Sequence, residues 1–210
     1  MVRTRSDEKR REILRVAAET FEELGYERTS MLTIAERMRG SKQTLYNHFG
    51  SKEELLRAVL DFDVSDVADQ ALEELSAEKS LRKGLQRLGD IYLTRQLAPL
   101  AISNIRIVAT QPPGSGIGED FYQNILCAAW KRLAHVLKAL MAEGKLRRAD
   151  PWLAAMHFKG LMLQDLLERQ LLNAARQATA KEIETAVKQA VDAFLRIYGI
   201  EEAEPKKARG

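Results

Sequence analysis

The sequence has 210 residues, of which 45% are hydrophobic and 30% are charged, and its formal net charge is only +3. This balance is ordinary for a globular protein and excludes a largely disordered chain. The single cysteine, Cys127, excludes an internal disulfide. No window approaches about 18 uninterrupted apolar residues, and the N-terminus lacks the apolar core of a signal peptide. We therefore expect a cytoplasmic protein without a transmembrane helix.

The first 50 residues predict three helices. Residues 7–24 carry apolar side chains at helical spacing and are followed by a glycine. Ser30 is suited to cap a short second helix that ends at Gly40, and Ser41 is suited to cap a third that reaches about His48. Two short helices joined by a glycine-containing turn are typical of a helix-turn-helix.

The rest of the chain is also predicted to be helical. Ser51 opens a long helix over 51–75, and glycines, prolines and caps then delimit helices near 79–97, 100–110, 117–143, 151–175 and 180–198. The fold class is therefore all-α: an N-terminal three-helix helix-turn-helix domain plus a larger helical regulatory and dimerisation domain. We expect the domains at 1–50 and 51–200, with 51–75 as the linking helix and 201–210 as a disordered tail.

The third helix has the chemistry of a DNA-reading element. Its first turn presents Lys42, Gln43 and Thr44, and the N-terminal residues of a recognition helix face the base edges. Lys42 suits guanine and Gln43 suits adenine, while Thr44 suits a thymine methyl group or a phosphate. The stretch from Arg37 to Lys52 contains four basic residues and no acidic one, and such a stretch attracts phosphate.

Other polar residues around this helix are candidates for phosphate contacts. Tyr46 and His48 can donate to the DNA backbone, and Lys52 stands at the start of the next helix. The predicted DNA-binding residues are Ser30, Thr33, Arg39, Ser41, Lys42, Gln43, Thr44, Tyr46, Asn47, His48 and Lys52.

This segment resembles the DNA-binding domain of the TetR family of transcriptional regulators over residues 10–56. The residues that carry the resemblance keep a fixed spacing: Thr29, Ser30, Ile34, Ala35, Ser41, Lys42, Thr44, Leu45, Tyr46, His48, Phe49, Ser51, Lys52 and Leu55. The resemblance implies a sequence-specific DNA-binding regulator, and we expect a repressor that a small, largely hydrophobic ligand releases from its operator.

One tripeptide departs from the family pattern. The family has Ala-Gly-Val before the Ser-Lys, whereas this chain has Met38-Arg39-Gly40. Either Arg39 adopts a left-handed backbone at some cost, or the turn moves by one residue onto Gly40. Arg39 is also an additional candidate phosphate contact.

The resemblance further implies a homodimer, in which the helices over 151–175 and 180–198 pair with their copies as a four-helix bundle. The operator is then expected to be near-palindromic double-stranded DNA. Apolar residues of these helices leave more apolar surface than one small domain needs: Leu161, Leu166, Leu167, Leu171, Ile183, Val187, Val191, Phe194 and Leu195.

By the same resemblance, a small-molecule effector of unknown identity would bind in the regulatory core, and the 51–75 helix would transmit the signal. Aromatic and methionine side chains at helical spacing can equally be plain core. The alternative is a C-terminal domain that binds a protein partner. The candidate lining residues are Phe62, Ile105, Leu126, Trp130, Phe158 and Met162, with Asn104, His135 and Asp165 as polar anchors.

Catalysis, metal binding and cofactors are not expected. His135 and His157 are isolated histidines, and together with Cys127 they have no recognisable metal-ligand spacing. Nothing in the sequence indicates a base that would activate the Cys127 thiol.

Overall fold

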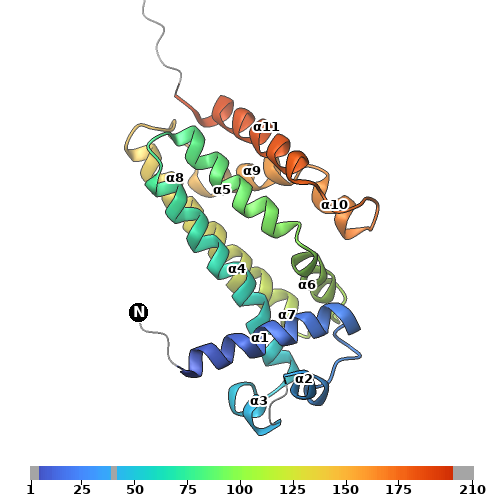
Figure 1. Ribbon diagram of the computed structural model, residues 1–210. Coiled ribbons are helices and arrows are strands. Elements are labelled where there is room, and N and C mark those ends of the chain that lie inside the picture. The colour runs from blue at the N-terminus through green and yellow to red at the C-terminus, as the bar shows by residue number, and fades with distance from the viewer. Residues whose placement is uncertain (1–4, 39–41, 201–210) are drawn as a thin grey trace, which may run out of the picture. The chain divides into compact units, whose positions relative to one another are not determined.

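The computed structural model describes residues 5–38 and 42–200. Three expectations lie outside these residues: the roles of Arg39 and Ser41, and the disordered tail over 201–210. The described chain is all-α, as predicted (Figure 1). Its elements are α1 (Arg5–Leu24), α2 (Met31–Arg37), α3 (Lys42–His48), α4 (Lys52–Ala77), α5 (Leu81–Gln96), α6 (Pro99–Ala109), α7 (Ile117–Asp120), the π-helical turn η1 (Phe121–Leu126), α8 (Cys127–Ala142), α9 (Pro151–Leu163), α10 (Leu166–Leu171) and α11 (Ala180–Tyr198).

The chain forms two compact units. Unit 1 comprises residues 1–67 and 95–128, and unit 2 comprises residues 68–94 and 129–210. The division by packing therefore does not follow the expected boundary after residue 50, because residues 52–67 of α4, together with α6, α7 and η1, belong to the same unit as the first three helices. A domain boundary at that residue remains a proposal about function.

Unit 1 is held together by one apolar core. Helix α1 contributes a buried stripe that includes Ile13, Ala17 and Phe21, which follows from its helical spacing of apolar residues. Leu45 of α3 and Ile107 of α6 bury their side chains in the same cluster. The three N-terminal helices and α6 are thus positioned by shared hydrophobic contacts.

Local signals in the sequence set the ends of the first helices. Gly25 ends α1 with a φ of 81°, a left-handed conformation that favours glycine. The Ser30 hydroxyl accepts a hydrogen bond from the backbone N–H of Thr33 at 3.0 Å, so it caps α2 as predicted. Ser51 likewise accepts from the backbone N–H of Glu54 at the start of α4.

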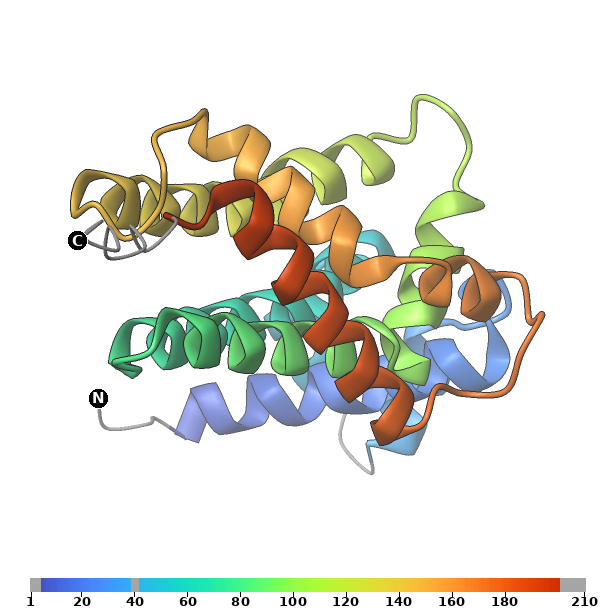
Figure 2. The ribbon, with the colours of Figure 1, turned by 90° about the horizontal axis from the view of Figure 1, so that it is seen from above.

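Unit 2 is organised around the pair formed by α9 and α11, which lie side by side (Figure 2). Phe158 of α9 meets Phe194 of α11 edge to face, with ring centroids 5.3 Å apart. Asp150 caps α9 by accepting from the backbone N–H of Leu153, and Pro151 occupies the first helical position.

Four of the apolar residues expected to be left for a second subunit are not available on the surface of α11. Ile183, Val187, Val191 and Phe194 are buried within their own protomer, because α11 turns this stripe toward α9 and the core of unit 2. The exposed large apolar side chains of this region are instead Trp152, Leu153, Leu172, Ile197 and Ile200.

Two predicted helices are interrupted. The helix expected over 151–175 ends at Leu163, because Gln164 has a φ of 45°, and only the short α10 follows. The helix expected over 117–143 contains the π-helical turn Phe121–Leu126 between α7 and α8. Helical periodicity predicts neither break, since both segments keep apolar residues at helical spacing. No helix of the described residues is long and apolar enough to cross a membrane.

Candidate nucleic-acid interface

Helix α3 is attached to unit 1 by its apolar side and turns its polar side outward. Leu45 is fully buried, and Phe49, directly after the helix, is buried as well. Lys42, Gln43, Tyr46 and Asn47 are exposed, and α3 contains no acidic residue. The outward surface of α3 is therefore polar and carries no negative charge.

The exposed residues of α3 form two side-chain pairs, each one turn apart. The Lys42 ammonium lies 5.6 Å from the centroid of the Tyr46 ring. The Gln43 side-chain amide donates a hydrogen bond from Nε2 to Oδ1 of Asn47 at 2.8 Å. The two residues nearer the core, Thr44 and His48, are half-buried. The structure thus brings together six of the predicted DNA-binding residues on one short helix.

The remaining predicted residues flank α3. Ser30 and Thr33 occupy the first turn of α2, where their hydroxyl oxygens lie 2.8 Å apart. The Lys52 ammonium donates to the carbonyl of Tyr26 at 3.0 Å and lies 4.2 Å from the centroid of its ring. Burial, followed by the neighbouring Glu53 carboxylate, raises the pKa of Tyr26 to about 12. One N–H of Lys52 is therefore used within the protein, which leaves two for other acceptors.

Arg10 of α1 is not among the DNA-binding residues predicted from the sequence. Its guanidinium lies over the ring of Phe49, 5.3 Å from the centroid, so an exposed cation stands beside the end of α3. The signal was present in the spacing, because Arg10 extends the stripe formed by Ile13 and Ala17 by one turn. Arg10 is accordingly a further candidate phosphate contact.

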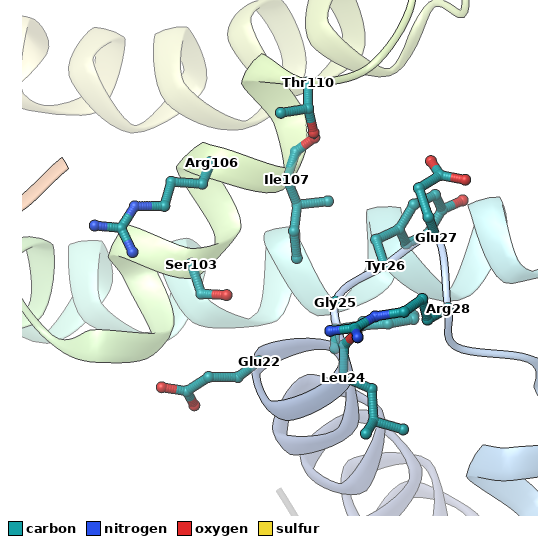
Figure 3. Close-up of a pocket in the computed structure, with 11 residues that line it drawn as sticks. Glu22, Leu24, Gly25, Tyr26, Glu27, Arg28, Ser103, Arg106, Ile107 and Thr110 are labelled. Atoms are coloured by element: carbon teal, nitrogen blue, oxygen red, sulfur yellow. The ribbon is translucent and has the colours of Figure 1, made fainter. Parts of the chain in front are cut away.

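A second feature that the sequence did not reveal is the contact between α1 and α6. The end of α1 and the loop after it face α6 across a groove of about 300 Å³ (Figure 3). Tyr26 and Arg28 line one side of it, and Ser103, Arg106 and Ile107 line the other. Helix α6 thus contacts α1 and faces, across this groove, the loop that leads into α2.

Four candidate ligand-binding residues belong to unit 1 and lie on α4, α6 and η1. Asn104 is only 3% exposed, and neither its Nδ2 nor its Oδ1 has a hydrogen-bond partner. Phe62 and Leu126 are partly buried against the core of unit 1, and Ile105 is half-buried. A buried amide without partners costs roughly 1–3 kcal/mol, which makes Asn104 the most informative of these positions.

The other five candidates belong to unit 2 and differ in their surroundings. Phe158 and Met162 are core residues, and Trp130 packs edge to face on Tyr92 with ring centroids 5.0 Å apart. His135 is exposed, and Asp165 is exposed and lies 3.4 Å from Arg169 in an ion pair. His135 and Asp165 therefore lack the buried, unpartnered polar atoms that distinguish Asn104. Among the described residues, no cluster of three or more His, Cys, Asp or Glu is placed to hold a metal.

Two models of protein families match the chain, one in its N-terminal part and one in its C-terminal part. Residues 13–59 match the model of the bacterial regulatory proteins of the tetR family. Residues 83–200 match the C-terminal domain of AefR-like transcriptional repressors, a model of the same family. The chain belongs to the TetR family. Members of this family are DNA-binding transcriptional regulators rather than enzymes; they bind DNA as dimers and respond to small-molecule ligands.

Solved structures of TetR-family regulators are similar over nearly the whole chain. A TetR-family regulator from Mesorhizobium loti is 29% identical, with a TM-score of 0.83 over 94% of this chain and all of the other. The flavonoid-responsive regulator FrrA is 27% identical, with a TM-score of 0.67 over 92% of this chain and 98% of its own.

The similarity to curated TetR-family relatives is confined to part of each protein. The transcriptional activator FasR of Mycolicibacterium smegmatis is 38% identical over 80 residues, which are 38% of this chain and 36% of FasR. The A-factor receptor protein of Streptomyces griseus is 40% identical over 57 residues, which are 27% of this chain and 21% of that protein. The matched regions thus span about a third of FasR and a fifth of the A-factor receptor.

Proposed function

We propose that this TetR-family protein is a cytoplasmic, sequence-specific DNA-binding repressor that a small, largely hydrophobic effector releases from its operator. The observation that carries the proposal is the outward surface of α3. Its exposed side chains are polar or cationic, and they include the amides of Gln43 and Asn47, which suit base edges. Leu45 and Phe49 attach the same helix to the core, so this polar surface is presented on a rigid element.

Selection of bound sequences from a random pool of double-stranded DNA tests the DNA-binding part of the proposal. A dimer should enrich a near-palindrome whose half-sites lie about one helical turn apart, or a multiple of it, so that each α3 enters one major groove. Enrichment of a single asymmetric half-site would contradict the dimeric arrangement. No enrichment of any sequence would contradict sequence-specific binding itself.

The dimer is proposed to form through α9 and α11, within the predicted ranges 151–175 and 180–198. Leu153 and Trp152 of α9 are exposed apolar residues, as are Ile197 of α11 and Ile200 just beyond it. Exposed apolar surface of this kind is typical of an interface between protein chains. Leu153→Asp should therefore separate the protomers without unfolding them, which sedimentation and thermal unfolding together can measure. An intact Leu153→Asp dimer would show that the interface lies elsewhere.

The proposed effector site is centred on Asn104. Its two amide atoms are buried without partners, whereas buried polar groups in proteins are nearly always hydrogen-bonded. A ligand with one donor and one acceptor would satisfy both atoms, while the apolar side chains of the unit 1 core would favour a hydrophobic body. Because FrrA is described as flavonoid-responsive, a flavonoid is a suitable first probe.

Helix α6 offers a route from this site to the DNA-binding helices. It carries Asn104, and it contacts α1 beside the loop that leads into α2 (Figure 3). A ligand that moves α6 would change the position of α1, in addition to the transmission expected through α4. Near-complete release requires about 5.5 kcal/mol of preference for the arrangement that does not bind DNA.

Titration calorimetry with and without operator DNA tests the effector. Linkage requires that DNA weaken effector binding by the same factor by which the effector weakens DNA binding. Asn104→Leu should abolish effector binding while keeping operator binding, and it should stabilise the free protein because it removes two unsatisfied polar atoms. If Asn104→Leu bound the effector as tightly as wild type does, the effector site would not be at Asn104. If a protein partner released the operator and no small molecule did, the alternative would be favoured, in which the C-terminal domain binds a protein rather than a small molecule.

A further inference from the structure

The contact between Gln43 and Asn47 narrows the kind of base that α3 can read. These residues lie one turn apart on α3, both are exposed, and Nε2 of Gln43 donates to Oδ1 of Asn47 at 2.8 Å. The parallel pair of Lys42 and Tyr46 keeps the Lys42 ammonium over the Tyr46 ring. The Gln43 amide is therefore oriented by a neighbour on its own helix.

The hydrogen bond changes what the Gln43 amide can offer to DNA. A glutamine side chain has one oxygen acceptor and two N–H donors that point in different directions. Asn47 occupies one N–H. If this is the N–H that points away from the carbonyl oxygen, the oxygen and the N–H on its own side remain for DNA. Adenine presents an acceptor, N7, next to a donor, the N6 amino group, whereas guanine presents two acceptors, N7 and O6. The acceptor and the donor that remain on Gln43 complement the donor and the acceptor of adenine. At guanine the Gln43 oxygen would face the O6 oxygen, so two acceptors would lie against each other.

We propose that Gln43 and Asn47 act as one reading unit for an adenine·thymine base pair in each half-site. Gln43 contacts the adenine, and Asn47 is a positioning residue that holds the amide in the orientation that rejects guanine. This inference rests on the proposed function, because it requires α3 to enter the major groove of DNA.

The test compares base preferences of four full-length variants with those of the wild-type chain. The operator is first selected from a random pool, and each position of a half-site is then changed in competition binding. The variants are Gln43→Ala, Asn47→Ala, Asn47→Asp and Asn124→Ala. Asn124 is a matched control, because its side-chain amide makes a hydrogen bond of the same length and spacing to Asp120, outside α3.

The expected results separate contact from positioning. Gln43→Ala should lose about 5- to 150-fold of discrimination at one A·T pair, the range for a bidentate base contact. Asn47→Ala should lose about two- to tenfold of the preference for adenine over guanine at that same pair, the range for one neutral hydrogen bond. Asn47→Asp keeps the acceptor, so it should retain the preference while binding all sequences more weakly through repulsion of phosphates. Asn124→Ala should leave every preference unchanged.

Two results would overturn the reading unit while leaving the proposed function intact. One is a recovered operator whose base preferences are the same for wild type and Asn47→Ala. The other is a Gln43-dependent position at which guanine or a pyrimidine is preferred. If the wild-type chain enriches no sequence, the proposed function fails, and the reading unit fails with it.

Discussion

Helices α3 and α11 use their side chains in opposite ways. In α3 the buried residue is Leu45, and the outward positions carry the groups proposed to meet DNA. In α11 seven residues are buried, and they form the inner side of the pair with α9: Ile183, Ala186, Val187, Ala190, Val191, Phe194 and Tyr198. Substitutions on the inner side of α11 should therefore act first on stability, whereas substitutions on the outward side of α3 should act on recognition and leave stability nearly unchanged.

The largest effect is expected from a charge placed on the inner side of α11. Val191→Asp buries a carboxylate at a position with no exposed surface, and an unpaired buried charge costs about 3–5 kcal/mol. Denaturant unfolding should show this loss, and any separation of protomers would follow from unfolding. Lys188→Asp, on the exposed side of the same helix, should change stability by no more than about 0.5 kcal/mol. Equal stability of Val191→Asp and wild type would contradict the burial of this face.

A smaller effect is expected where α5 approaches the α9–α11 pair. A Cβ added at Gly89 would lie 2.9 Å from Sδ of Met162 and 2.9 Å from Cγ1 of Val187. Gly89→Ala should therefore lower the free energy of unfolding by about 1–3 kcal/mol. In Gly160→Ala of α9 the added Cβ meets no atom within 4 Å, so thermal unfolding should show a gain of up to about 1 kcal/mol. If Gly89→Ala and Gly160→Ala changed the free energy of unfolding in the same direction, close packing at Gly89 would be contradicted.

The cap of α11 should make stability depend on pH in the acid range. Hydrogen bonds from the hydroxyl and then the backbone N–H of Thr179, followed by Arg176, lower the pKa of Glu182 to about 2. Its pKa in the unfolded chain lies near 4.5, so this stabilisation is present above about pH 4.5 and is lost as the pH falls through about 2. The free energy of unfolding should be measured as a function of pH for wild type and for Glu182→Gln. We expect the variant to be less stable than wild type at neutral pH and equally stable once the pH is low enough to protonate Glu182. A difference in stability that does not change with pH would mean that the geometry of the Glu182 side chain, and not its charge, stabilises the cap.

The smallest effect on stability is expected on the outward side of α3. Asn47→Ala removes an exposed side chain and one exposed hydrogen bond, so the free energy of unfolding should change by no more than about 0.5 kcal/mol. Thermal unfolding of this variant beside Val191→Asp is the sharpest form of the comparison between the two helices. A large loss of stability in Asn47→Ala would mean that α3 is less firmly attached by Leu45 and Phe49 than their burial indicates.

Much of the helical framework follows from local signals. Ser30 caps α2, Gly25 ends α1, and Asp150-Pro151 begins α9, each as the sequence predicts. Periodicity failed at the breaks within the predicted helices over 151–175 and 117–143. These breaks are decided by backbone conformations that apolar spacing does not encode, such as the positive φ of Gln164.

The all-α class, the helix-turn-helix and the polar chemistry of α3 can be predicted from the sequence, because caps, turns and spacing act over a few residues along the chain. The direction in which each apolar stripe faces depends instead on how the helices pack in three dimensions. From the sequence, Val187 and Val191 are predicted to be apolar surface available to a second subunit. In the structure both are buried, because α11 packs against α9. The burial of Asn104 without a hydrogen-bond partner and the hydrogen bond between Gln43 and Asn47 likewise follow from the tertiary structure, since burial and side-chain pairing depend on what lies nearby in space.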